Sequence, residues 1–153
     1  MSGLEMRIPP PVYLLLFGAV MWLLATATPT WSWQHPLSLT LGWGLVAIGV
    51  GFDLGGLWRF IKARTTINPH RPHTTSALVV EGLYRFTRNP MYLGMLLLLI
   101  GWGLVLGSAV ALLLPPLFAL WLTRVQIVPE ERVLGEKFGA PYREYLKRVR
   151  RWI

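Results

Sequence analysis

Charged and tyrosine side chains crowd one short segment of this 153-residue chain, at the start of a long apolar run. Within it, Asn89 and Pro90 have a simple structural explanation, because Asn is a favoured helix N-cap and Pro fits the first helical position. That explanation does not account for Tyr84, Arg88 and Tyr92 beside them. The chain has no cysteine, which excludes disulfides, thiolate metal ligands and a cysteine nucleophile. Any chemistry must therefore come from other side chains or from a bound cofactor.

A second polar segment holds two adjacent acids, Glu130 and Glu131, directly after Pro129. This pattern predicts a helix that starts at the proline, because the helix dipole favours acids in the first turn. Gly139 is expected to end that helix, and Pro141 to begin another. The second helix has an apolar and a basic face, which predicts an interfacial helix on anionic lipid. The apolar face comprises Tyr142, Tyr145, Leu146, Val149, Trp152 and Ile153, and the polar face comprises Arg143, Glu144, Lys147, Arg148, Arg150 and Arg151.

Other polar residues give weaker signals. His70 and His73 have a metal-like spacing, but no helix puts both on one face and no carboxylate lies beside them. We therefore expect no bound metal. Asp53 lies inside an apolar run, where an acid is costly. Pairing with Arg59, six residues later, explains Asp53 as well as a role toward a substrate does, and both interpretations stay open.

The composition excludes a water-soluble domain. Apolar residues make up 54% of the chain and charged residues 14%, whereas soluble domains have about a quarter of their residues charged. Four segments approach the length of about 20 apolar residues that a bilayer core requires. We therefore predict an all-α, polytopic membrane protein with about four transmembrane helices, a cytoplasmic loop and C-terminal interfacial helices. The single membrane domain covers 1–153, with spans at 11–28, 39–61, 91–108 and 109–128, the loop at 62–90 and the C-terminal helices at 129–153.

Features inside the spans predict how they pack. The first segment also resembles a cleavable signal peptide, but Trp22, Trp31 and Trp33 fit a retained helix with an aromatic belt. Pro115 and Pro116 are expected to kink the fourth span, with room for a cofactor cleft beside the kink. Small residues four apart predict close contacts between helices. They are Ala47, Gly51 and Gly55 in the second span and Gly103 and Gly107 in the third.

The basic residues set the orientation. All fifteen lie before the first span, between positions 59 and 90, or from 124 onward, so the connections at 29–38 and 107–108 carry none. The positive-inside rule then places both termini and the middle loop in the cytoplasm, in a multi-pass protein of the cytoplasmic membrane. The net charge of +8 predicts adhesion to anionic lipid headgroups rather than nucleic-acid binding, because the basic residues flank membrane spans.

Two spaced motifs resemble the isoprenylcysteine carboxyl methyltransferase and phospholipid methyltransferase superfamily of integral membrane enzymes. The first is Gly82-x-Tyr84-x-x-x-Arg88-Asn89-Pro90-x-Tyr92-x-Gly94, where the family pattern has Gly-x-Tyr followed by Arg-His-Pro-x-Tyr-x-Gly. The second is Glu130-Glu131-x-x-Leu134-x-x-x-Phe138-Gly139-x-x-Tyr142-x-x-Tyr145-x-x-x-Val149, which follows the family's carboxyl-terminal signature. Asn89 stands where the family has His. It keeps a hydrogen-bond donor but lacks the imidazole on which an acid–base role there would depend.

The resemblance implies a methyltransferase that uses S-adenosylmethionine and needs no metal. The methionine carboxylate of that cofactor would bind Arg88 and the start of the third span, and its ammonium and sulfonium would bind acids and aromatic faces. An amine acceptor would need a general base, for which Glu131 is the nearest candidate. The implied catalytic residues are Arg88 and Glu131, and the implied cofactor-binding residues are Tyr84, Arg88, Asn89, Tyr92, Gly94, Glu130, Glu131 and Tyr142.

The resemblance also implies a hydrophobic or lipid-like acceptor that enters between the helices from the membrane. Its identity stays open among a prenylated cysteine, an aminophospholipid, a small thiol and another hydrophobic acid, because the apolar residues around it specify little. Three alternatives to a methyltransferase stay open. They are an NADPH-dependent sterol-type reductase, whose family has much longer chains, a non-catalytic membrane scaffold, and a transporter or channel, which the lack of a visible inverted repeat disfavours.

Overall fold

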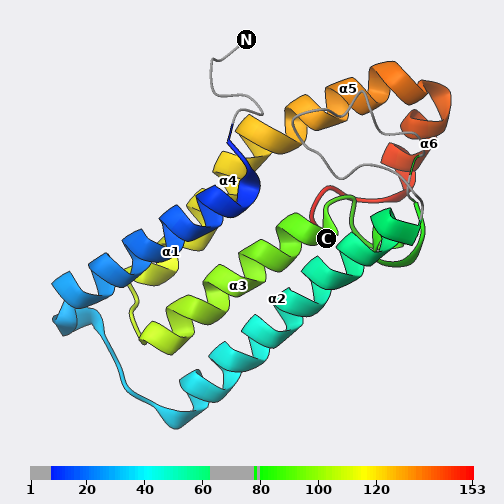
Figure 1. Ribbon diagram of the computed structural model, residues 1–153. Coiled ribbons are helices and arrows are strands. Elements are labelled where there is room, and N and C mark those ends of the chain that lie inside the picture. Colours follow the sequence, from blue (N-terminus) through cyan, green and yellow to red (C-terminus); the bar gives the residue numbers. More distant parts are fainter. Residues whose placement is uncertain (1–7, 63–77, 79) are drawn as a thin grey trace.

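The computed structural model describes residues 8–62, 78 and 80–153, and its regular structure there is helical. Figure 1 shows α3 between α2 on one side and the pair α1 and α4 on the other. Beyond this bundle, α5 continues the line of α4, and α6 folds back from its end. The bounds are α1 Pro10–Ala27, α2 Pro36–Lys62, α3 Pro90–Leu106, α4 Leu114–Leu122, α5 Val128–Phe138 and α6 Ala140–Arg148, with short helices η1 Pro29–Trp31, η3 Gly82–Arg85, η4 Ala111–Leu113 and the π-helix η5 Thr123–Ile127.

The helices have the length and surface of membrane spans. Three helical stretches are long and apolar enough to cross a bilayer, namely Pro10–Ala27, Pro36–Arg59 and Ala111–Phe138, and α3 is a shorter apolar helix of 17 residues. Large apolar side chains cover the outside of α1 and α2, as at Leu15 and Leu54, whose exposed fractions are 72% and 60%. In water this exposure would be unfavourable, whereas lipid tails accept it. The all-α, polytopic membrane fold is therefore confirmed.

Glycines bring α2 and α3 into backbone contact. A Cβ added at Gly42 would lie 2.8 Å from the carbonyl oxygen of Gly101, and one added at Gly49 would lie 2.8 Å from that of Gly94. The glycines of each helix are seven residues apart, which is two turns and keeps them on one face. The stripe predicted at spacing four in α2 is wrong, because Gly51 in its middle has no atom near the place of a side chain. The close contact predicted at Gly103 in α3 is present, since a Cβ there would meet the side chains of Leu112 and Met21.

The prolines of the fourth span lie where the helix changes type. The short 3-10 helix η4 ends at Leu113 and the α-helix α4 begins at Leu114, with Pro115 and Pro116 in its first turn. The helical stretch continues through this change, and the kink expected at the prolines stays a prediction. A second irregularity lies further on, in the π-helix η5 before Pro129.

The segment after α4 also differs from prediction. Ile127, immediately before α5, has helical dihedral angles, with φ −67° and ψ −49°. Thus α4, η5 and α5 form one continuous helical stretch, and Pro129 lies in the first turn of α5 without a free helix end before it. At the other end, α6 stops at Arg148 and Val149 is extended. The predicted interfacial helix is therefore shorter, and the last residues are available to pack elsewhere.

Candidate functional site

Three distant segments of the chain meet at the start of α3. They are the connection from η3 into α3, the region around the start of α5, and the last residues of the chain, which Figure 1 shows running back from α6 toward α3. Thr87 and Arg150 form a parallel β-bridge, in which the backbone N–H of Arg88 donates to the carbonyl oxygen of Arg150 at 3.0 Å. The bridge fixes the chain's end beside the first polar motif.

Glu131 is the centre of an ion-pair cluster. Arg151 donates from Nε to Oε1 at 3.0 Å and from Nη2 to Oε2 at 2.7 Å, which is a side-on, two-bond arrangement. Arg88 Nη2 lies 3.3 Å from Oε1 of the same carboxylate. The side chains of Arg88 and Glu131 are only 13% and 16% exposed. Two guanidinium groups thus share one carboxylate in a largely enclosed place.

Glu130 has neutral partners. Its Oε1 accepts hydrogen bonds from the hydroxyl of Tyr92 at 2.7 Å and from Nε2 of Gln126 at 2.8 Å. Two polar atoms around these glutamates are buried and have no hydrogen-bond partner among the described residues, namely Nε of Arg88 and Oε1 of Gln126. Unpartnered buried polar atoms are costly. Their presence on both sides of the cluster indicates a place for a polar ligand.

Tyrosines form the wall of this cluster. Tyr84 and Tyr142 are buried, and the hydroxyl of Tyr145 donates to the carbonyl oxygen of Tyr84 at 2.7 Å. Burial raises the pKa of Tyr84, Tyr142 and Tyr145 above the ordinary value for a phenol. The three side chains therefore stay neutral near pH 7. Hydrogen bonds to Glu131 raise the pKa of Arg151, which stays charged.

The cluster brings together most of the predicted site. Arg88, Glu130 and Glu131 lie within it, as do Asn89 and the tyrosines at 84, 92 and 142. Asn89 occupies the N-cap position of α3, but its side chain makes no capping hydrogen bond, so that expectation is wrong. Its Nδ2 donates instead to the carbonyl oxygen of Arg151 at 2.9 Å.

Gly94 and Asp53 lie elsewhere, in the contact between α2 and α3. Gly94 packs against Gly49 and the carboxylate of Asp53, so it spaces the helices and does not line the cluster. Asp53 does not pair with Arg59, because Arg59 Nη1 lies 3.5 Å from Oε2 of Glu81. One oxygen of Asp53, Oδ1, is buried and has no partner among the described residues.

The histidines at 70 and 73 lie outside the described residues. Within the described residues, no group of three or more His, Cys, Asp or Glu side chains could hold a metal ion. The expectation that the protein binds no metal therefore stays a prediction.

Sequence reasoning did not assign four residues to the site, namely Thr123, Gln126, Arg151 and Trp152. Gln126 lies four residues before Glu130, a spacing at which helical side chains meet, and this was a signal available in the sequence. Arg151 was assigned to a lipid-facing surface, and no pattern distinguishes it from its basic neighbours. Trp152 donates from Nε1 to Oγ1 of Thr123 at 3.2 Å, which ties the chain's end to the π-helix.

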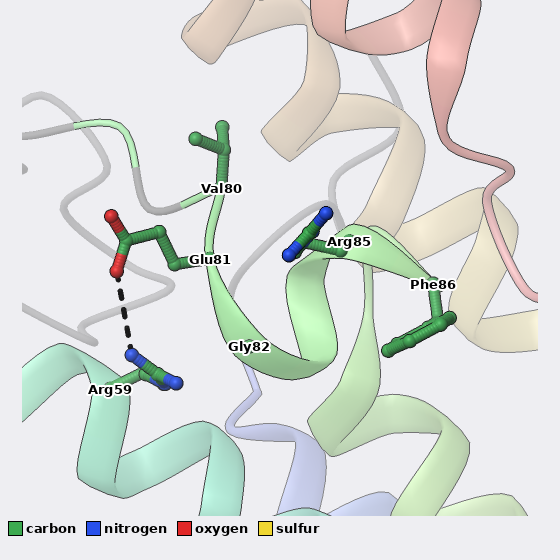
Figure 2. A pocket seen from close by; sticks show the side chains of 6 residues that line it. All are labelled: Arg59, Val80, Glu81, Gly82, Arg85 and Phe86. Carbon is green, nitrogen blue, oxygen red and sulfur yellow. Dashed lines mark hydrogen bonds and ion pairs between the residues drawn. The ribbon is translucent and has the colours of Figure 1, made fainter.

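A surface pocket lies at η3, between this short helix and Arg59 of α2 (Figure 2). Its volume is about 470 Å³, and the Arg59–Glu81 ion pair lies at its edge. Phe86 is 76% exposed there. The pocket shares the helix η3 with the cluster but none of the cluster's contacts. Its lining comprises Arg59, Val80, Glu81, Gly82, Arg85 and Phe86.

Comparison with known proteins agrees with the motif resemblance. The model of the phospholipid methyltransferase family matches residues 37–141, more than half of the chain. The chain belongs to this phospholipid methyltransferase family. The match includes the polar motif before α3 and both glutamates of α5, and it ends before the last residues of the cluster. Together with the apolar helices, it makes the protein a multi-pass membrane member of a methyltransferase family.

Two relatives match parts of the chain. An uncharacterized protein of Haemophilus influenzae is 46% identical over 63 residues, which are 41% of this chain and all of that protein. A protein-S-isoprenylcysteine O-methyltransferase of Schizosaccharomyces pombe is 35% identical over 72 residues, which are 47% of this chain and 30% of that enzyme. No solved structure matches the chain.

Proposed function

We propose that this member of the family is an integral membrane methyltransferase that uses S-adenosylmethionine to methylate a hydrophobic or lipid-like acceptor. The observation that carries the proposal is the cluster around Glu131, in which two guanidinium groups share one carboxylate and Nε of Arg88 has no partner among the described residues. It lies at one end of helices whose outer surfaces are apolar. The site would therefore meet a polar cofactor on one side and a lipid-soluble acceptor on the other.

The residues of the cluster suit the chemical groups of this cofactor. Arg88 offers a cation and a free donor to the methionine carboxylate. Glu130, which accepts hydrogen bonds from the neutral side chains of Tyr92 and Gln126, offers negative charge to the ammonium group. The buried faces of Tyr84 and Tyr142 suit a sulfonium cation. When bound, S-adenosylmethionine supplies an activated methyl group. The protein's own contribution is to position this group against the acceptor and to exclude water.

The two glutamates have different chemical capacity. Glu131 is paired with two arginines, which favours a role in balancing their charge. Glu130 accepts hydrogen bonds from a phenol and an amide, so of the two it is the one to which a substrate amine could donate. A carboxylate or thiolate acceptor would need no base, whereas an amine acceptor would. An amine substrate would thus depend on Glu130 more strongly than a carboxylate substrate.

The orientation and the lipid contacts belong to the same proposal. Both termini and the cluster face the cytoplasm of the cell, in the cytoplasmic membrane, because the basic residues gather at this end. The exposed side chains of Arg143, Lys147 and Arg148 on α6 would rest on anionic headgroups. The acceptor would reach the cluster sideways, from the membrane.

Calorimetric titration of the purified protein with S-adenosylhomocysteine and, separately, with NADPH tests the proposal. We expect saturable binding of S-adenosylhomocysteine alone. Transfer of labelled methyl groups from S-adenosylmethionine into a membrane lipid extract should follow in the same preparation. Binding of NADPH alone would favour a reductase, and binding of neither compound by a folded protein would favour a scaffold.

A further inference from the structure

The charge balance of the cluster depends on one residue at the end of the chain. Arg151 makes both of its hydrogen bonds to Glu131 at 2.7 and 3.0 Å, whereas Arg88 makes a single, longer contact of 3.3 Å. Charge-assisted hydrogen bonds are shorter and stronger when both oxygens are engaged. Glu131 is thus held by Arg151 in preference to Arg88. Arg88 is therefore the more weakly paired of the two arginines, and its Nε has no partner among the described residues.

Hydrogen bonds with Thr87, Asn89 and Thr123 hold the last residues of the chain in place. The carbonyl oxygen of Arg151 accepts from Nδ2 of Asn89 at 2.9 Å and from Oγ1 of Thr87 at 3.3 Å. Trp152, the next residue, is hydrogen-bonded to Thr123 of the π-helix. The side chain of Asn89 therefore helps to hold the backbone of Arg151 in place. Because it is a neutral amide, it does so without a change of charge with pH.

We propose that Arg151 is a positioning residue of the cofactor site, which engages Glu131 so that Arg88 stays free to bind the carboxylate of the cofactor. This inference rests on the proposed function. It extends the site to a segment that lies beyond residues 37–141 and thus outside the match to the family. Without Arg151, Glu131 would pair with Arg88 side-on and the two charges would cancel.

The test compares two probes in the full-length protein. S-adenosylhomocysteine carries the amino-acid group, and 5′-methylthioadenosine carries the same nucleoside and thioether without it. In Arg151→Gln, we expect the calorimetric affinity for S-adenosylhomocysteine to fall about tenfold or more, as for the loss of a hydrogen bond to a charged group. The affinity for 5′-methylthioadenosine should stay within about twofold. The exposed neighbour Arg150→Gln is the matched control and should change neither affinity.

A double variant distinguishes positioning from a merely structural role. If Arg151 acts by engaging Glu131, then removing the charge of both in Glu131→Gln/Arg151→Gln should restore most of the affinity for S-adenosylhomocysteine. An equal loss for both probes in Arg151→Gln, or no recovery in the folded double variant, would overturn the inference. If the unaltered protein does not bind S-adenosylhomocysteine, both the proposed function and this inference are wrong. If it binds with an affinity that Arg151→Gln leaves unchanged, only the inference is wrong.

Discussion

At each end of the helical bundle a β-bridge joins two segments of the chain, but the side chains around the two bridges differ in charge. At one end, Ser32 and Ser108 form an antiparallel bridge between the α1–α2 and α3–α4 connections, and the N–H of Trp33 donates to the carbonyl oxygen of Gly107 at 2.7 Å. At the other end, Thr87 and Arg150 form a parallel bridge between the start of α3 and the chain's end. We call these the neutral end and the charged end.

The difference lies in what surrounds each bridge. The connections of the neutral end, at 29–38 and 107–108, contain no Lys, Arg, Asp or Glu, so its closure depends on backbone hydrogen bonds and packing. The charged end adds an ion-pair cluster with buried, unpartnered polar atoms. Such atoms weaken a structure and persist where function requires them. We therefore expect the neutral end to serve stability and the charged end to serve binding as well.

The strongest test of this difference is removal of charge at Glu131. In Glu131→Gln two guanidinium groups lose their shared carboxylate, so the charges of Arg88 and Arg151 repel each other without compensation. We expect methyl transfer into a lipid extract to fall about a hundredfold or more while the protein stays folded. Melting temperature is the folding control.

Glu130→Gln provides the matched comparison within the same helix. An amide oxygen can still accept the bonds from Tyr92 and Gln126, so we expect a smaller loss of methyl transfer. A larger loss in Glu130→Gln than in Glu131→Gln would move the principal role to Glu130 and point to an amine acceptor. Near-normal transfer by both variants would leave the acids with a structural role alone, in the ion pairs and hydrogen bonds that they make.

The next effect in size concerns the binding of the cofactor at Arg88. Arg88→Ala should weaken the binding of S-adenosylhomocysteine by about 1.5–3 kcal/mol, the range for a hydrogen bond to a charged group. Arg88→Lys should recover only part of this loss, because an ammonium group cannot reproduce the two-bond geometry of a guanidinium. Unchanged affinity in a folded Arg88→Ala protein, measured by calorimetry, would favour a structural role for the ion pair.

The helices of the fold were predictable, because a bilayer demands long apolar segments and leaves few alternatives. Their detailed packing was not. Spacings of four and of seven both place residues on one helix face, so the sequence permitted two glycine stripes in α2. Only the position of α3 selects Gly42 and Gly49, which lie against Gly101 and Gly94.

The site was predictable as far as its motifs extend. Arg88 and the two glutamates lie in the resembling segments, and the structure brings them together. Arg151 was not predictable, because a basic residue near a membrane serves equally well as a lipid contact. Its role depends on the end of α6 at Arg148 and on the extended chain that returns to α3, and both are consequences of tertiary packing.

A smaller effect is expected at the neutral end, on stability alone. Gly107 has φ +60°, and a Cβ there would collide with the carbonyl oxygen of Trp33. Gly107→Ala should therefore destabilise the protein by about 1–3 kcal/mol. The affinity of the folded fraction for S-adenosylhomocysteine should stay unchanged. A shifted affinity at constant melting temperature would contradict the separation of the two ends.

The least perturbing test asks which side of the membrane each end faces. The chain has no cysteine, so single substitutions introduce unique labelling sites. Ser32→Cys lies at the neutral end, and Ala140→Cys lies at the start of α6 beyond the charged end. Both positions are exposed, and neither side chain takes part in the ion-pair cluster. We expect stability and affinity to change little in either variant.

Because the basic residues gather at the charged end, we expect that end to face the cytoplasm, as the positive-inside rule predicts. An impermeant thiol reagent should therefore label position 32 in intact cells, and position 140 only after the membrane is opened. This orientation also matches the chemistry, since S-adenosylmethionine is a water-soluble cytoplasmic compound and could reach the cluster without crossing the bilayer. Labelling of intact cells at position 140 but not at 32 would reverse the topology, and it would leave the charged end facing away from the cofactor proposed for it.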